Sequence, residues 1–126
     1  MKIPENLFYT EDHEWVKVEG NHAVVGITDF AQKELGDIVY VEVETVGEKL
    51  EKGEVFGTVE AVKTVSDLFL PINGTIKELN DALDQNPELI NNDPYGKGWM
   101  VKLEIEDDLD KSGLLNYESY KALIGA

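Results

Sequence analysis

The sequence predicts a mainly β protein, a flattened β-barrel or sandwich of two small antiparallel sheets with short helices and a C-terminal helix. Short runs of alternating apolar and polar residues occur early and late in the chain, as in half-buried strands. Between these runs Gly47, Gly53, Gly57 and Gly74 interrupt the sequence at intervals too short for helices. Apolar residues at helical spacing near the end predict the C-terminal helix.

The first predicted element is a β-hairpin. Apolar residues mostly alternate with polar ones from Glu14 to Ile27, and Glu19-Gly20-Asn21 separates the two runs. Thr28 is a suitable N-cap for a short helix over Asp29 to Leu35, and Gly36 suits the position after its end. The chain therefore begins with two strands and one helix.

The middle of the chain returns to strands. Residues 38–43 are rich in β-branched and aromatic side chains. Pro71-Ile72-Asn73-Gly74 predicts a turn, and the following strand runs to Leu79. Strands between the glycines must be brief and antiparallel or rolled.

The last third combines a loop and a strand. Residues 80–97 collect Asp, Asn, Pro and Gly, which predicts an ordered loop with one helical turn after Pro87. From Trp99 to Glu106 the alternation is the cleanest in the chain, with Met100 on the polar side.

The predicted terminal helix follows an acidic segment. Asp107-Asp108-Leu109-Asp110 lacks the ligand spacing of a calcium loop and is read as negative charge before a helix N-terminus. Asn116 caps the helix, Gly125 ends it, and its apolar spacing predicts a lid on a sheet. The apolar and aromatic residues of this helix are Tyr117, Tyr120, Ala122, Leu123 and Ile124.

Composition limits the class of protein. A length of 126 residues predicts one domain, residues 1–126. The net charge of −15 disfavours nucleic-acid and membrane-surface binding and weakly favours a monomer. Without cysteine the chain itself supplies no thiol chemistry. The sequence shows neither a membrane span nor a signal peptide, so we expect a cytoplasmic protein.

Lys63 is the residue with the most unusual surroundings. It lies between two alternating runs, so a tight turn over Ala61-Val62-Lys63 would expose its ammonium group at a hairpin tip. An exposed lysine is ordinarily a solubilising surface charge. Apolar Val62 and Val65 beside it are unusual for a simple surface turn, and a recognised, modified lysine would explain them.

Several motifs resemble one family. Residues 47–79, with V-E-A-V-K at the turn and P-I-N-G-T-I after it, resemble the hairpin core of biotinyl and lipoyl carrier domains. H-E-W-V, G-I-T-D-F-A-Q, L-G-D-I-V and N-D-P-Y-G-K-G-W-M, at residues 13–16, 26–32, 35–39 and 92–100, resemble the H protein of the glycine cleavage system. The resemblance extends to the C-terminal helical appendage, residues 107–125, and implies the barrel-sandwich hybrid fold.

The resemblance implies a non-catalytic carrier with lipoic acid joined covalently to Lys63. In the family, the lipoyl arm receives an aminomethyl group from glycine decarboxylase, a pyridoxal-phosphate enzyme. A tetrahydrofolate-dependent aminomethyltransferase unloads it, and dihydrolipoyl dehydrogenase reoxidises the dithiol with FAD and NAD. A lipoate-attaching enzyme is the fourth implied partner.

Three acidic residues are candidates for roles around the arm. A cationic cargo in a water-poor cleft needs carboxylates, and Glu14 and Asp67 lie in segments that match the family. Alternatively, Glu14 is a solvated strand carboxylate and Asp67 a turn residue bonded to its own backbone. Glu60 could be recognised by the lipoate-attaching enzyme. The chain departs from the family at Ala61, commonly serine, and at Phe30, where some members carry histidine.

Other functions remain alternatives. A lipoate-relay protein, or a lipoyl carrier for a different multienzyme system, would use the same Lys63. A biotin carrier usually has methionine on both sides of its lysine, where this chain has Val62 and Thr64. An acidic interaction domain with an unmodified lysine is the last alternative. His13 and His22 have no spacing typical of a metal site.

Overall fold

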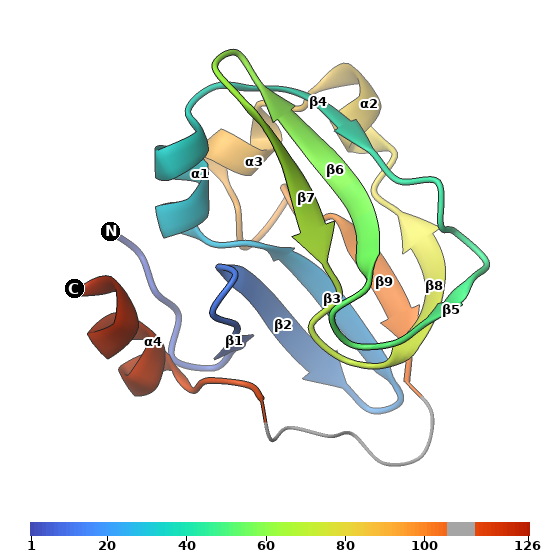
Figure 1. The fold of residues 1–126 in the computed structure, drawn as a ribbon, viewed down its shortest axis with the longest axis horizontal. Coiled ribbons are helices and arrows are strands. Elements are labelled where there is room, and N and C mark those ends of the chain that lie inside the picture. Colours follow the sequence, from blue (N-terminus) through green and yellow to red (C-terminus); the bar gives the residue numbers. More distant parts are fainter. Residues whose placement is uncertain (106–112) are drawn as a thin grey trace.

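The computed structural model describes residues 1–105 and 113–126 and places the strands in two antiparallel sheets (Figure 1). The larger sheet has the order β1-β2-β3-β9-β8-β5, and the smaller has the order β4-β6-β7. The predicted mainly β fold with two antiparallel sheets, short helices and a C-terminal helix is confirmed. The strands are β1 (Phe8–Tyr9), β2 (Glu14–Glu19), β3 (His22–Ile27), β4 (Ile38–Glu42), β5 (Lys49–Leu50), β6 (Val55–Ala61), β7 (Val65–Phe69), β8 (Gly74–Leu79) and β9 (Val101–Glu104).

The first hairpin and helix form as predicted. Strands β2 and β3 pair from Glu14 opposite Ile27 to Glu19 opposite His22. Helix α1 (Asp29–Leu35) begins after Thr28, whose hydroxyl accepts a hydrogen bond from the N–H of Ala31 at 3.2 Å. It ends at Gly36, whose φ of 82° suits a glycine. Helix α1 therefore carries the chain from the larger sheet to the smaller one.

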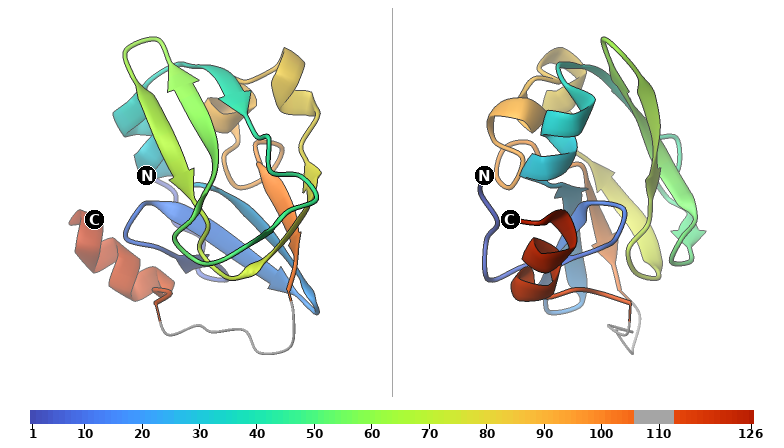
Figure 2. Two further views of the ribbon diagram at one scale, coloured as in Figure 1. Left: turned by 45° about the vertical axis from the view of Figure 1, so that its right-hand side comes forward. Right: turned by 60° about the vertical axis from the view of Figure 1, so that its left-hand side comes forward.

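The two sheets face each other across one apolar cluster, and the helices lie at the ends and edges (Figure 2). The larger sheet contributes Val16, Val25, Ile76, Val101 and Leu103, and the smaller sheet contributes Val59, Phe56 and Leu68. Burial of these side chains is the main term that holds the sheets together.

The loop after β8 contains more helix than predicted. Helix α2 (Ala82–Gln85) precedes the expected turn after Pro87, which is α3 (Leu89–Asn92). Four-residue helices are too short to produce a periodic apolar pattern, so the sequence indicated only the one with a proline before it.

The strand predicted from Trp99 begins later. Trp99 donates its backbone N–H to the carbonyl of Gly96, as part of a turn, and regular pairing starts at Val101 in β9. The placement of Met100 on the polar side was wrong, because this side chain is fully buried in the apolar cluster.

Helix α4 (Tyr117–Ile124) confirms the predicted terminal helix. The Asn116 side chain accepts from the N–H of Ser119 at 2.8 Å, and Gly125 has φ of 71°. Tyr120 stacks on Tyr9 of β1 with 4.6 Å between ring centroids. The start of the predicted appendage at residue 107 and the acidic segment 107–110 lie outside the described residues. Among the described helices, none is long and apolar enough to cross a bilayer.

Candidate functional site

Lys63 lies in the turn that joins β6 to β7, as predicted. The turn is closed by the N–H of Ala61, which donates to the carbonyl of Thr64 at 2.7 Å. Lys63 is exposed, and the Val62 and Val65 side chains beside it are 76% and 61% exposed. In Figure 1 this turn forms the tip of the β6–β7 hairpin of the smaller sheet, at the end of the molecule where α1 to α3 gather.

The turn is held against the end of α1. The N–H of Val62 donates to the carbonyl of Asp37 at 3.0 Å. The Lys63 side chain extends over Gly36, where a Cβ atom would lie 3.3 Å from the lysine Cε. Gly36 therefore serves the positive φ of the helix end and leaves space for the lysine stem.

A cleft of about 140 Å³ adjoins this helix. We call it the α1 cleft. Its apolar walls are Ile27, Ala31, Leu35, Val59 and Leu68, from both sheets and from α1. Leu35 directly precedes Gly36, so the cleft begins next to the residue under the Lys63 side chain.

The structure brings the two candidate carboxylates to this cleft. Glu14 of β2 and Asp67 of β7 both line it, together with Asp12 and Glu34. They differ in environment, because Glu14 is only 2% exposed whereas Asp67 is an exposed residue. Asp67 is paired with Thr58 within a strand, so the alternative interpretation of a turn residue was wrong. The interpretation of Glu14 as a solvated carboxylate was also wrong.

The buried carboxyl group of Glu14 links the two sheets. Its Oε2 accepts from the backbone N–H of Phe69 at 2.9 Å, and its Oε1 accepts from the Thr10 hydroxyl at 3.1 Å. Burial raises the pKa of the Glu14 carboxyl to about 8, because these two hydrogen bonds to the charged form only partly offset the loss of hydration. At neutral pH the group is therefore mostly protonated.

His13 is a cleft residue that the sequence did not indicate as one. Its φ of 66° is in the left-handed region, which is uncommon outside glycine. The ring lies 4.7 Å from the Phe30 ring, and Nδ1 is 2.9 Å from the Tyr120 hydroxyl of α4. Burial lowers the His13 pKa, against the effects of Asp12 and Glu34. No sequence pattern specified this backbone conformation or the partner 107 residues away.

Glu60 lies on the outer face of the smaller sheet. Its cross-strand neighbours are Tyr40 of β4 and Val65 of β7, so the three side chains share that face in one row. The pairing of β4 skips Val39, and this bulge leaves both Val39 and Tyr40 46% exposed. An apolar surface around one carboxylate therefore adjoins the Lys63 turn.

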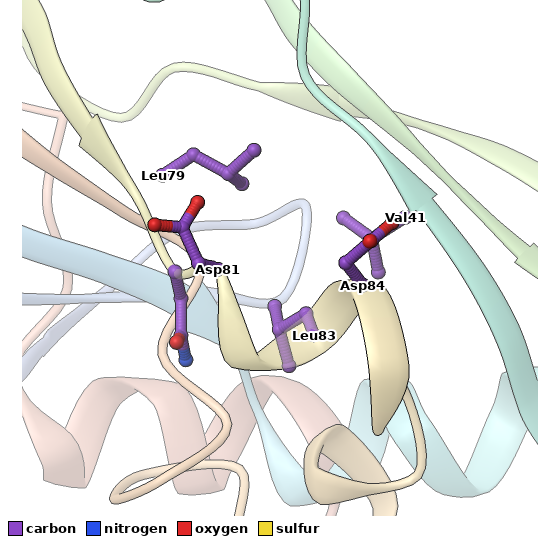
Figure 3. Close-up of a pocket in the computed structure, with 6 residues that line it drawn as sticks. Val41, Leu79, Asp81, Leu83 and Asp84 are labelled. Carbon is purple, nitrogen blue, oxygen red and sulfur yellow. The ribbon is translucent and has the colours of Figure 1, made fainter.

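A larger hollow lies elsewhere on the molecule. It has a volume of about 300 Å³ and is formed at α2, where Leu83 and Asp84 meet Val41 of β4 (Figure 3). The other residues around it are Leu79, Asn80 and Asp81. None of these belongs to the Lys63 turn or to α1, so we assign the candidate site to the α1 cleft.

Nothing in the described residues indicates a metal centre. His13 precedes β2 and His22 begins β3 at the opposite end of the same hairpin. Within residues 1–105 and 113–126 no group of three or more histidines and acidic residues has an arrangement that could hold a metal ion.

Comparison with known proteins identifies the relatives. The family profile "Glycine cleavage H-protein" matches residues 7–126. The chain is 58% identical to the glycine cleavage system H protein of Bacteroides thetaiotaomicron over 124 residues, 98% of each chain. It is 56% identical to that of Bacteroides fragilis over the full length of both. The crystal structure of a glycine cleavage system H protein from Mycobacterium marinum superimposes with a TM-score of 0.89 at 39% identity, covering 98% of this chain and 100% of that one.

The pKa of Glu14 predicts how stability depends on pH. Between about pH 5 and 8 the folded protein holds a proton that the unfolded chain has lost, so raising the pH favours unfolding. The Glu14 contribution to stability is complete below the unfolded pKa near 4.5 and is lost as the pH rises toward 8. Glu14→Gln removes this titration. The decrease in the free energy of unfolding from pH 5 to pH 8 should therefore be smaller in Glu14→Gln than in the wild type by roughly 2 to 4 kcal/mol.

Urea unfolding at pH 5 and pH 8 measures this difference. Glu19→Gln is the matched control, because Glu19 lies on the same strand with a side chain that is 59% exposed. If the free energy of unfolding depended on pH equally in the wild type and in Glu14→Gln, the raised pKa assigned to Glu14 would be contradicted.

Proposed function

Because the chain belongs to the glycine cleavage H-protein family, we propose that its lipoyl group is attached to Lys63. The chain is the lipoyl-carrying shuttle of the glycine cleavage system, and it is itself a non-catalytic carrier. The observation that carries the proposal is the position of Lys63, exposed at a hairpin tip and laid over Gly36, the residue that follows Leu35 of the α1 cleft.

The residues around Lys63 fit an amide-linked arm. Acylation removes the ammonium charge, so the modified side chain can lie against apolar surface at lower cost. Val62 is exposed beside it, and Leu35 and Ala31 offer such surface along α1. When bound, lipoic acid would supply the dithiol chemistry that a cysteine-free chain lacks.

The arm would be long enough to enter the α1 cleft. Lysine and lipoate together would reach on the order of 12 to 15 Å from the lysine Cα. Helix α1 has seven residues and is therefore about 10 Å long. An arm that leaves Lys63 over Gly36 and runs along α1 can bring its end to the cleft walls.

Glu14 and Asp67 would hold a cationic cargo at the end of the arm. A buried cation requires a paired anion, and Glu14 is the deeply buried acid of the cleft. The arrival of the cation would lower the Glu14 pKa, so the carboxyl group would ionise and release a proton near pH 7. Asp67 faces solvent, so its attraction is screened and its contribution should be smaller.

The proposed partners follow from membership in the glycine cleavage system. They are the pyridoxal-phosphate glycine decarboxylase, the tetrahydrofolate-dependent aminomethyltransferase and dihydrolipoyl dehydrogenase with its FAD and NAD. The arm would visit these active sites in turn. A cytoplasmic location and a monomeric state stay predictions from composition.

We also propose that the lipoate-attaching enzyme recognises Glu60 together with the surface around it. That enzyme must bring the activated lipoyl carboxyl group to the lysine Nζ itself, so it has to cover the surface next to the turn. Tyr40, Glu60 and Val65 form the paired row next to the turn, and Val62 extends it. A partner with an apolar recess beside a basic group would fit this row.

The attachment site is tested by intact mass and peptide mapping after incubation with a lipoate ligase, ATP and lipoate. One lipoyl adduct on Lys63 is expected, and Lys63→Arg should remain unmodified because a guanidinium does not form the amide. Lys77→Arg, a change at an exposed lysine of β8, is the control and should be modified like the wild type. A wild-type protein that stays unmodified while a known acceptor is lipoylated would refute the proposal. A biotin adduct on Lys63 in a parallel reaction with a biotin ligase, ATP and biotin, without lipoylation in the first reaction, would also refute it.

Recognition by the attaching enzyme is tested by the rate of lipoylation. Glu60→Gln and Val65→Ser should each lower kcat/KM several-fold, about the effect of losing 1 kcal/mol at an interface. Glu42→Gln and Val55→Ser change exposed residues of the same sheet farther from the turn and should leave the rate unchanged. Equal rates for all four variants would remove Glu60 and Val65 from the recognition surface.

The sheltering role is tested with protein loaded with the aminomethyl cargo. Attack by water releases formaldehyde and ammonia, so the rate of ammonia release without an acceptor measures exposure of the cargo. Glu14→Gln should raise this rate about tenfold, and Asp67→Asn should raise it less, because only Glu14 is desolvated. Glu60→Gln, on the outer face, is the control and should release ammonia at the wild-type rate. A rate in Glu60→Gln as high as that in Glu14→Gln would contradict the proposed role of the cleft.

A further inference from the structure

We infer that Asn91 is a positioning residue for the Lys63 turn. Its side-chain amide clamps the two residues on either side of Asp37, and Asp37 holds the turn. The functional part of this inference rests on the proposed attachment of lipoate to Lys63. Asn91 itself lies on α3 and reaches the turn only through the segment that follows α1.

The amide of Asn91 makes three hydrogen bonds of equal length. Its Nδ2 donates to the side-chain oxygen of Gln32 and to the carbonyl of Gly36, each at 2.9 Å. Its Oδ1 accepts from the N–H of Ile38 at 2.9 Å. Both donor hydrogens and one acceptor position are therefore used, and all three partners belong to α1 or to the segment after it.

The clamp encloses the residue that anchors the turn. Asp37 lies between Gly36 and Ile38, and its carbonyl accepts the N–H of Val62. Gly36 lies under the Lys63 stem. Fixing the carbonyl of Gly36 and the N–H of Ile38 therefore orients the Val62 hydrogen bond and the Lys63 contact that the turn makes with this segment.

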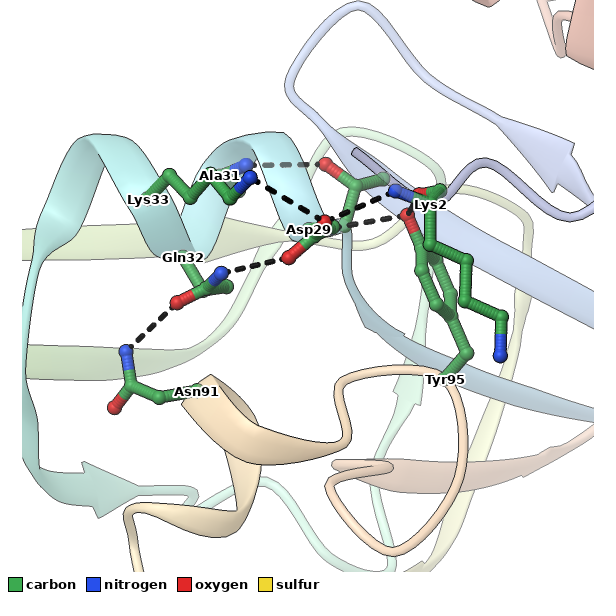
Figure 4. A network of polar contacts seen from close by, with 8 residues as sticks. Lys2, Asp29, Ala31, Gln32, Lys33, Asn91 and Tyr95 are labelled. Carbon is green, nitrogen blue, oxygen red and sulfur yellow. Dashed lines mark hydrogen bonds and ion pairs between the residues drawn. The ribbon is translucent and has the colours of Figure 1, made fainter.

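A network behind α1 sets the orientation of the Asn91 amide (Figure 4). Gln32 donates from Nε2 to Asp29 at 2.7 Å, which leaves its oxygen to accept from Asn91. Asp29 in turn accepts from the backbone N–H of Lys2 at 3.1 Å and donates its own N–H to the Tyr95 hydroxyl at 2.9 Å. A carboxylate at position 91 would place an oxygen against the carbonyl of Gly36, so the site specifically requires an amide.

The clamp matters for function because few other contacts among the described residues order the tip of this hairpin, namely the Ala61–Thr64 hydrogen bond and the pairing of Ala61 with Ile38. The β6–β7 pairing ends at Glu60 opposite Val65, and the turn residues project beyond it. An attaching enzyme that must align the lysine Nζ with an activated carboxyl group works faster on a turn that already has one conformation.

Amide hydrogen exchange by NMR on the unmodified protein tests the clamp. Asn91→Ala should raise exchange at Val62 and Ile38 by about tenfold or more, as expected when a hydrogen bond that orders them is lost. Exchange at Val25 and Val101, paired in the larger sheet, should stay as in the wild type. Asn92→Ala is the matched control, because Asn92 is the exposed next residue of α3.

A second variant separates the clamp from simple loss of packing. Asn91→Asp keeps the volume of the side chain and the acceptor for Ile38 but loses both donors, so it should also release Val62. Lipoylation kcat/KM should fall about threefold to tenfold in both Asn91 variants and not in Asn92→Ala.

Three results would overturn the inference. Unchanged exchange at Val62 would show that Asn91 does not hold the turn, and faster exchange at Val25 and Val101 as well would assign it a general structural role. Unchanged lipoylation kinetics with a released Val62 would remove the positioning role. If the wild type is never lipoylated, the proposed function fails instead, because the exchange measurements do not depend on the modification.

Discussion

The arrangement of the site depends on one part-buried contact between the sheets. A carboxyl oxygen of Glu14, on the larger sheet, accepts the backbone N–H of Phe69, on the smaller one. A backbone N–H that is partly removed from water needs an acceptor, and here a side chain supplies it at the edge strand β7. The contact that closes the sandwich at this edge therefore also places an ionisable group in the α1 cleft.

Helix α1 contributes both to the contact under Lys63 and to the apolar wall of the cleft, because it connects the two sheets. Its C-terminal end provides Gly36 beneath Lys63, and Ala31 and Leu35 form a wall of the cleft. The end of α1 thus contacts the proposed attachment point, and residues of this seven-residue helix line the cleft that holds the buried acid of β2. A shift of this helix would move Gly36 and the apolar wall relative to Lys63 and Glu14, which explains why side chains from several other segments fix the helix in place.

Local features of the fold were predictable from sequence, and long-range ones were not. Thr28, Gly36 and the apolar residues around Lys63 are local signals, and each led to the correct element. The resemblance to a family indicated Glu14 and Asp67, and the structure adds that Glu14 is buried whereas Asp67 is not. The roles of Asn91 and His13 depend on partners 53 to 107 residues away, and Met100 faces inward because of the turn before it. The spacing of apolar residues in the sequence carries no information about such long-range contacts.

For the proposed pairing of Glu14 with a cationic cargo, a protonated carboxyl group would suit a carrier better than a permanent charge. A carboxylate held ionised in an empty cleft would carry a large desolvation cost, and the raised pKa avoids it by keeping the group neutral. In the proposed shelter, a cation that enters would ionise Glu14, so part of the attraction would be spent on releasing the proton. The net affinity would therefore be lower than for a permanently charged group, which would let the proposed cleft protect a cationic group from water and still give it up when an enzyme offers a better site. A group with an unperturbed pKa would bind the cation without this offset, and the arm would leave the cleft less readily.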